Sequence, residues 1–199
     1  MTDCFALLEQ ARRPWLDSDL LKKKFFELSA RFHPDRVHNA SESEKAAAHQ
    51  RYTEINGAYN CLRNPKDRLR HLLELERGSR PADLQQIPPE LMNLFMEVSR
   101  ACRDADAFLV EKGKVSSPLL KVQMFERSQS WVEKLTVVQR TLNDWHEVLV
   151  ADLKANDAQW SSPPDRARVL ERLDSLYRLF SYCNRWSAQV QECIARLSF

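Results

Sequence analysis

His33, Pro34 and Asp35 place an imidazole and a carboxylate two residues apart, with a proline between them. These side chains can form hydrogen bonds to a partner, or could ligate a metal ion together with His38. A proline cannot continue a helix and disfavours helical geometry in the residue before it, so we expect a loop here. Metal binding is disfavoured, because proline restricts the loop and no fourth ligand lies nearby in the sequence.

The remaining reactive residue types form no catalytic or metal-binding pattern. The five cysteines are scattered without a CxxC pair, which favours small buried side chains in a reducing compartment. They are Cys4, Cys61, Cys102, Cys183 and Cys193. Three further histidines, His49, His71 and His146, fall on predicted helices and are expected to be structural or exposed. Because no Ser-His-Asp ordering, phosphate loop or HExxH motif occurs, we expect no enzyme activity, no catalytic residue, no metal and no cofactor.

Composition favours an all-α protein. Only three glycines occur among 199 residues, and helix-forming residue types are abundant. The formal net charge of +2 gives no strongly basic surface, which argues against nucleic-acid binding. The first residues lack a signal-peptide pattern, and no apolar run approaches 18 residues, so we expect a soluble, cytoplasmic protein without membrane attachment.

Two amphipathic helices are predicted on either side of the His33 loop. Asp17 can cap the first helix, and Ser41 with Glu44 forms a capping box for the second. Apolar residues recur at helical spacing along both: Leu21, Phe25, Leu28 and Phe32 in the first, and Ala48, Tyr52, Ile55, Tyr59 and Leu62 in the second. An antiparallel helical hairpin is the expected arrangement.

A shorter helix and a bundle should follow the hairpin. Asn64 and Pro65 can start the short helix, and Gly78 can end it. The proline-rich residues 79–87 are predicted to be a linker. Beyond it, three helical patterns begin near Pro88, Ser117 and Pro163, with apolar residues three and four apart. We therefore expect an N-terminal domain over 1–78 and a three-helix bundle over 88–199. The apolar stripe predicted for the first bundle helix is Leu91, Phe95, Val98, Cys102, Ala105 and Leu109.

The hairpin with its His-Pro-Asp loop resembles the J-domain of the DnaJ co-chaperones. The segments "LLKKKFFELSARFHPDR", "INGAYNCLRNP" and "DRLRHLL" appear in J-domain order and spacing. A J-domain followed directly by a linker and a helical bundle is similar to the HscB-type co-chaperones of iron–sulfur cluster assembly. "LMNLFMEVSRA", at residues 91–101, resembles the start of the HscB C-terminal domain.

This resemblance implies that the protein is an adaptor, and that the reaction it promotes takes place in a partner protein. The J-domain would dock on a DnaK- or HscA-type chaperone and speed its ATP hydrolysis. The implied docking residues are His33, Pro34, Asp35, Lys23, Lys24, Arg31 and Arg36. Phe26 departs from the J-domain pattern, and we expect it to pack on Trp15 or to touch the chaperone.

The resemblance also implies a client on the first bundle helix. Leu91, Met92, Phe95 and Met96 are the candidate contacts for an iron–sulfur scaffold protein of the IscU type. Met96 and Ser99 stand where the HscB pattern has acidic residues, which favours an apolar patch over a charged one. A J-protein of the same architecture that serves a different client is therefore the alternative.

Overall fold

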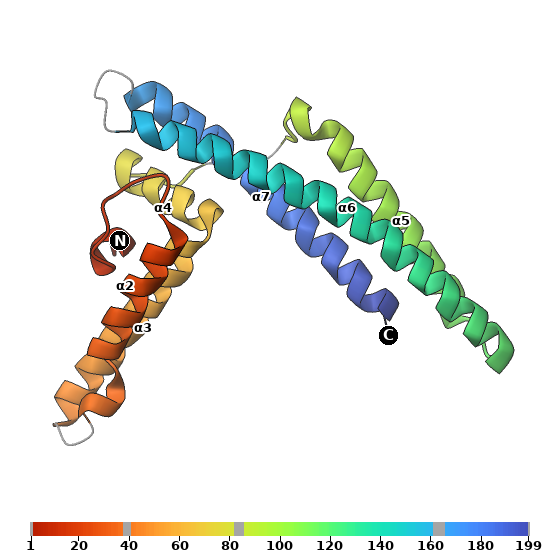
Figure 1. The fold of residues 1–199 in the computed structure, drawn as a ribbon, viewed down its shortest axis with the longest axis horizontal. Helices are drawn as coiled ribbons and strands as arrows, with labels where there is room; N and C mark the ends of the chain where they lie inside the picture. Colours follow the sequence, from red (N-terminus) through yellow and green to blue (C-terminus); the bar gives the residue numbers. More distant parts are fainter. Residues whose placement is uncertain (1, 38–40, 82–85, 161–165, 199) are drawn as a thin grey trace. The chain divides into compact units, whose positions relative to one another are not determined.

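The computed structural model describes residues 2–37, 41–81, 86–160 and 166–198, and all regular elements in these ranges are helices (Figure 1). This confirms the predicted all-α class. Of the residues singled out in the sequence, His38 and Pro163 lie outside the described ranges, as do residues 82–85 of the predicted linker. No helix in the described ranges is both long and apolar enough to cross a membrane.

The chain divides into two compact units. The first contains residues 1–83 and 151–177, and the second contains residues 84–150 and 178–199. The sequence places all of 88–199 in one bundle, whereas the structure groups 151–177 with the N-terminal residues. The boundary at 79–87 stays a prediction.

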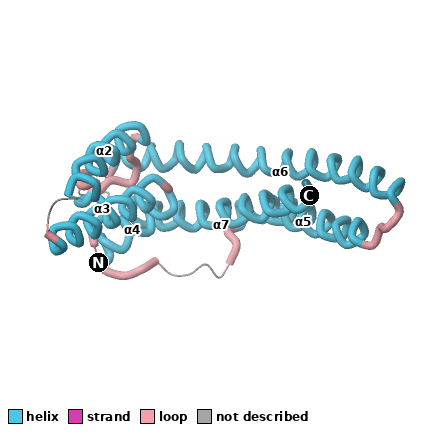
Figure 2. Tube along the Cα trace, turned by 90° about the horizontal axis from the view of Figure 1, so that it is seen from below, coloured by secondary structure: helices cyan, strands magenta, loops and turns pink. Residues whose placement is uncertain are grey.

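A helical hairpin forms the centre of the first unit. Helix α2 (Ser18–Arg31) begins at the Asp17 cap, and α3 (Glu42–Arg63) begins at the Ser41–Glu44 capping box, as predicted. The two helices lie side by side (Figures 1 and 2). Between them Phe25 stacks on Tyr59 with ring centroids 4.1 Å apart. The buried apolar side chains of the pair are Leu21, Leu28, Ile55, Ala58 and Leu62.

Helix α4 (Pro65–Arg77) follows directly and holds a buried arginine. Asn64 caps its first turn, and Gly78 ends it with a left-handed φ of 70°, which glycine adopts without strain. The Arg68 side chain is 4% exposed and donates to the carbonyl oxygens of Pro14 (2.7 Å) and Leu62 (2.6 Å). These two bonds tie α4 to the segment before α2 and to the end of α3.

Parts of the last two helices complete the first unit. In α6 (Pro118–Gln159), the buried carboxylate of Asp157 pairs with Arg13 and accepts the Trp15 backbone N–H at 3.2 Å. In α7 (Arg166–Ser198), Arg166 pairs with Glu76 of α4 at 2.6 Å. The sequence analysis did not anticipate these contacts, because they join residues 90 or more positions apart.

The N-terminal segment packs on the hairpin through a short helix. Helix α1 (Cys4–Leu7) is capped by Asp3 and buries Phe5, and Leu8 after it is buried too. Glu9 then adopts a φ of 51°, a left-handed conformation that is uncommon outside glycine. Its carboxylate lies 2.7 Å from the ammonium of Lys24 on α2.

The second unit is built from α5 (Met92–Gly113), residues 118–150 of α6 and residues 178–198 of α7. The sequence predicts that Phe95 and Leu109 are core residues of α5, but both are half-buried. Their neighbours Leu94 and Phe108 are buried instead. The prediction was wrong by one residue at these two positions, because apolar side chains stand at both neighbouring positions and helical spacing does not locate the centre of a wide stripe. It is confirmed for Leu91, Val98, Cys102 and Ala105. The buried side chains of α5 are Leu94, Val98, Cys102, Ala105 and Phe108.

Replacing Arg68 with methionine should destabilise the first unit by about 3 kcal/mol, because two charge-assisted hydrogen bonds disappear and two buried carbonyl groups lose their partner. Burial lowers the pKa of Arg68 to about 10, so the guanidinium is charged at neutral pH. Urea unfolding followed by circular dichroism measures the loss. The half-buried Arg70 serves as the control, since Arg70→Met should cost less than about 1 kcal/mol. Equal stabilities of Arg68→Met and wild type would contradict this role.

Replacing Lys24 with glutamine should raise the pKa of Glu9 toward its ordinary value of 4.5. The hydrogen bond from Lys24 lowers the pKa of Glu9, and the bond to Glu9 raises the pKa of Lys24 above 10.5. The ion pair therefore stabilises the fold between pH 4.5 and pH 10.5, the ordinary pKa values of the two groups. Its contribution is lost as Glu9 is protonated at lower pH or as Lys24 is deprotonated at higher pH. NMR titration of the Glu9 carboxyl measures the shift. Lys23→Gln is the control, and the same Glu9 pKa in all three proteins would rule out the ion pair.

Candidate functional site

The His33 loop joins the two hairpin helices by a short, ordered turn. Helix α2 ends at Arg31, and the N–H of Phe32 still donates to the carbonyl of Leu28 at 3.0 Å. Pro34 then opens the 3-10 helix η1 (Pro34–Val37), in which the Arg36 N–H donates to the His33 carbonyl at 3.0 Å. The structure thus places the tripeptide immediately outside α2, as its proline predicts.

The two polar side chains of this loop are oriented by local contacts. The backbone N–H of Asp35 donates to Nδ1 of His33 at 3.3 Å, so this contact fixes the orientation of the ring. The His33 ring also meets the Tyr52 ring of α3 edge-on, with centroids 5.4 Å apart. The His33 side chain is 46% exposed and that of Asp35 is 88% exposed. A donor and an acceptor are therefore presented together at the surface.

The basic residues predicted around the loop fall into two groups. Lys23, Arg31 and Arg36 are exposed, and the Arg31 guanidinium lies 5.3 Å from the centre of the Phe32 ring. Lys24 differs, because its side chain is 25% exposed and its ammonium is engaged by Glu9 at 2.7 Å and Glu27 at 3.4 Å. Lys24 is thus tied to the N-terminal segment, while the other three cations face solvent.

An exposed aromatic residue accompanies these cations on α2. Phe26 is 57% exposed, its ring centroid is 5.5 Å from that of Phe25, and the Lys22 ammonium lies 5.9 Å from its centre. Trp15 lies beneath the ammonium of Lys154, at 4.8 Å from the ring centre. Of the two roles expected for Phe26, its exposure favours contact with a partner.

The four predicted client contacts occupy different environments on the second unit. Leu91 is fully buried in the core, and this corrects the expectation that it contacts a client, because a side chain without accessible surface cannot meet a partner. Met92 is 44% exposed and Met96 is 61% exposed. Phe95 is half-buried, with its ring centroid 5.9 Å from that of Trp186.

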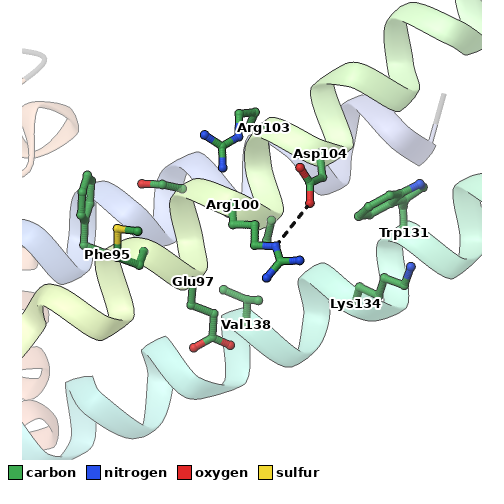
Figure 3. Close-up of a pocket in the computed structure, with 11 residues that line it drawn as sticks. Phe95, Glu97, Arg100, Arg103, Asp104, Trp131, Lys134 and Val138 are labelled. Carbon is green, nitrogen blue, oxygen red and sulfur yellow. Dashed lines mark ion pairs between the residues drawn. The ribbon is translucent and has the colours of Figure 1, made fainter.

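Phe95 and Met96 line a groove of about 670 Å³ between α5 and α6 (Figure 3). Trp131 and Val138 contribute apolar surface from α6, and the Lys134 ammonium lies 4.3 Å from the centre of the Trp131 ring. These α6 residues are not among the client contacts expected from the sequence. No signal in the sequence would have found them, because helical spacing does not give the register of one helix against another.

Charged residues surround this apolar groove. Arg100, Arg103 and Lys134 contribute three cations, while Glu97 and Asp104 contribute two carboxylates. Arg100 and Asp104 form an ion pair with the guanidinium Nε 3.9 Å from the carboxylate oxygen. The groove can therefore take an apolar side chain at its centre and acidic groups at its edge.

Two kinds of comparison with known sequences agree on the family. Residues 3–71 match the family model of the DnaJ domain. A co-chaperone HscB homolog from Vibrio vulnificus (strain CMCP6) is 30% identical over 163 residues, which cover 81% of this chain and 84% of that protein. The homolog from Vibrio atlanticus (strain LGP32) is 33% identical over 138 residues, covering 63% of this chain and 80% of that protein.

Two solved structures share the fold. Chaperone HscB from Vibrio cholerae is 24% identical, has a TM-score of 0.57 and is matched over 96% of both chains. The human co-chaperone HscB is 16% identical, has a TM-score of 0.62 and is matched over 98% of this chain and 81% of that one. With its DnaJ domain and these relatives, the chain belongs to the HscB family of J-domain co-chaperones.

Proposed function

We propose that this chain stimulates the ATPase of a DnaK- or HscA-type chaperone and delivers an iron–sulfur cluster scaffold protein of the IscU type to it. The observation that carries the proposal is the ordered, exposed loop of His33, Pro34 and Asp35 at the end of the α2–α3 hairpin. The HscB family membership supports the same function. The chain itself then needs no catalytic residue, since ATP hydrolysis takes place in the partner.

Stimulation is a shift of the chaperone's conformational population. The J-domain binds best to the chaperone conformation in which the ATPase groups are aligned, and so stabilises that conformation. His33 and Asp35 form hydrogen bonds across the interface. Because Pro34 restricts the loop and Tyr52 contacts the His33 ring, little conformational freedom is lost on binding.

The exposed cations next to the loop guide the encounter. Lys23, Arg31 and Arg36 attract an acidic surface over about 8 Å at physiological ionic strength. Lys24 serves the fold instead, through its ion pair with Glu9. We expect the docking surface to include Phe26, whose exposed ring lies on the same helix.

The scaffold protein docks on the α5–α6 groove through an apolar segment. Met92 and Met96 supply flexible, polarizable contacts on α5. The surrounding Arg100, Arg103 and Lys134 favour acidic residues beside the apolar anchor of the client. Because Met96 and Ser99 depart from the acidic HscB pattern, a different client with an apolar and acidic segment is the second candidate. Identification of the client that co-purifies with the chain separates the two.

His33→Gln and Asp35→Asn should each reduce chaperone ATPase stimulation at least tenfold, because each removes a hydrogen-bonding group from the interface. Since both side chains are exposed, the free energy of unfolding should change by less than about 0.5 kcal/mol. Steady-state ATP hydrolysis and urea unfolding provide the two measurements. Asp144→Asn, an exposed carboxylate of α6, is the matched control. Normal stimulation by either loop variant would contradict the proposed docking role.

Met92→Ala combined with Met96→Ala should weaken binding of the scaffold protein by about 1 to 3 kcal/mol, the cost of losing interface anchors. Chaperone stimulation without the scaffold should not change. Calorimetric titration measures the affinity, and Val148→Ala, which truncates another exposed apolar residue of α6, is the control. If affinity for the scaffold and for any co-purified client is unchanged while the melting temperature falls, the groove is not the client site.

A further inference from the structure

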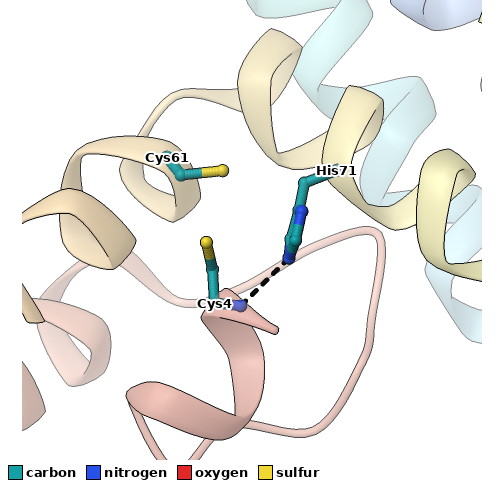
Figure 4. A group of neighbouring side chains, drawn as sticks. All are labelled: Cys4, Cys61 and His71. Carbon is teal, nitrogen blue, oxygen red and sulfur yellow. Dashed lines mark hydrogen bonds between the residues drawn. The ribbon is translucent and has the colours of Figure 1, made fainter. Parts of the chain in front are cut away.

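Three side chains that can ligate a soft metal ion meet in the first unit, and none of them belongs to the proposed docking residues. Cys4 belongs to α1, Cys61 to α3 and His71 to α4. The two sulfur atoms and a ring nitrogen of His71 all lie within 4.8 Å of one another. Figure 4 shows the Cys4 side chain pointing toward Cys61 and the Cys61 side chain pointing toward His71. The sequence analysis treats these residues separately and misses the cluster, because Cys4 and Cys61 are 57 positions apart.

Contacts around the cluster hold each group in place. The backbone N–H of Cys4 donates to Nε2 of His71 at 3.0 Å, and the ring of His71 stacks on that of Phe5. The sulfur of Cys61 lies 3.6 Å from the carbonyl oxygen of Asp67. His71 is 6% exposed, while both cysteines are half-buried. The cluster is thus preformed, and its two cysteines are more exposed than the histidine.

We propose that Cys4, Cys61 and His71 form a binding site for a thiophilic divalent cation of the Zn²⁺ class. Two thiolates and one imidazole are a donor set that Zn²⁺ prefers. Zinc-to-sulfur bonds of about 2.3 Å in tetrahedral geometry hold two thiolates about 3.8 Å apart, so small side-chain rotations from the present separations suffice. Among the described residues, no other group of three such side chains comes this close.

The two thiols of the proposed site interact closely enough to change each other's pKa. A hydrogen bond from Cys61, helped by His71, lowers the pKa of Cys4 to about 5, and the same contact together with burial raises the pKa of Cys61. Both cysteines would bind the cation as thiolates, and the thiol protons that the cation displaces would leave to solvent. Coordination through Nε2 replaces the hydrogen bond from Cys4.

The fourth coordination position has a candidate in Asp3, the residue that caps α1. An oxygen of Asp3 lies 3.9 Å from Nε2 of His71, although Asp3 also caps α1 and pairs with Arg12. A water molecule is the other ligand that can complete four-coordinate geometry. In either case the bound cation would join α1 to α3 and α4, and would stabilise the N-terminal segment of the J-domain against unfolding.

Co²⁺ titration of the reduced, metal-free full-length chain tests the site, because thiolate coordination gives an intense charge-transfer band. We expect one Co²⁺ per chain, displaced by Zn²⁺, and a Zn²⁺-dependent rise in melting temperature. Cys4→Ser and Cys61→Ser should each weaken binding at least tenfold and abolish that rise. The matched control is Cys193→Ser, which removes one member of the neighbouring pair Cys102 and Cys193 in the second unit and should bind like wild type.

Several results would overturn the site. They are the absence of a thiolate band in the reduced wild type, a Cys4→Ser variant that binds Co²⁺ as tightly as wild type, or loss of binding in Cys193→Ser alone. Far-UV circular dichroism of each variant checks that it is folded, and Cys61→Ala provides a second variant if Cys61→Ser is not. A chain that forms a Cys4–Cys61 disulfide in air and binds no Co²⁺ when reduced would identify the cluster as a thiol pair without a metal.

Discussion

The packing of α2 against α3 decides where the loop of His33, Pro34 and Asp35 lies. Phe25 and Tyr59 stack between the helices, and the leucines and isoleucine beside them are buried, so the two helices cannot separate without exposing this core. Pro34 prevents α2 from continuing, and the chain must turn at that end of the hairpin. The buried side chains of the hairpin lie between α2 and α3, before and after the turn. His33 and Asp35 in the turn itself remain exposed.

The rest of the first unit supports the opposite end of this hairpin. Arg68 joins α4 to the residues before α2, and Asp157 of α6 holds Arg13 and the backbone of Trp15. The loop thus extends from a hairpin whose base is fixed by buried ionic and polar contacts. A buried charge without its partner is costly, so these contacts favour one arrangement of the base.

Local signals in the sequence predicted much of this hairpin. The caps at Asp17, Ser41 and Asn64 and the left-handed end at Gly78 depend on neighbouring residues only, and all four appear in the structure. Contacts between distant residues were not predictable in this way. Helical spacing correctly placed Leu91 in the core of this region, but it chose Phe95 where Leu94 is buried. The resemblance to the HscB pattern, not the spacing, counted Leu91 among the client contacts.

The same limit applies to the groove and to the thiol cluster. Trp131 and Lys134 lie opposite α5 because of the way α6 is aligned along it. Cys4 lies next to Cys61 because α1 packs on α3. The alignment of one helix along another leaves no periodic pattern in the sequence. The packing of a helix as short as α1 leaves none either. Cysteine can fill a core or ligate a metal ion, so the residue type alone did not indicate the proposed cluster.

The central claim is that one chain acts on the chaperone and carries the scaffold protein at the same time. The most direct test is the steady-state ATPase rate of a DnaK- or HscA-type chaperone, measured with this chain alone, with the scaffold protein alone and with both. We predict that both together stimulate more than the product of their separate effects, because this chain binds the scaffold protein and so raises its effective concentration at the chaperone. A rate with both that equals the rate with this chain alone would contradict it.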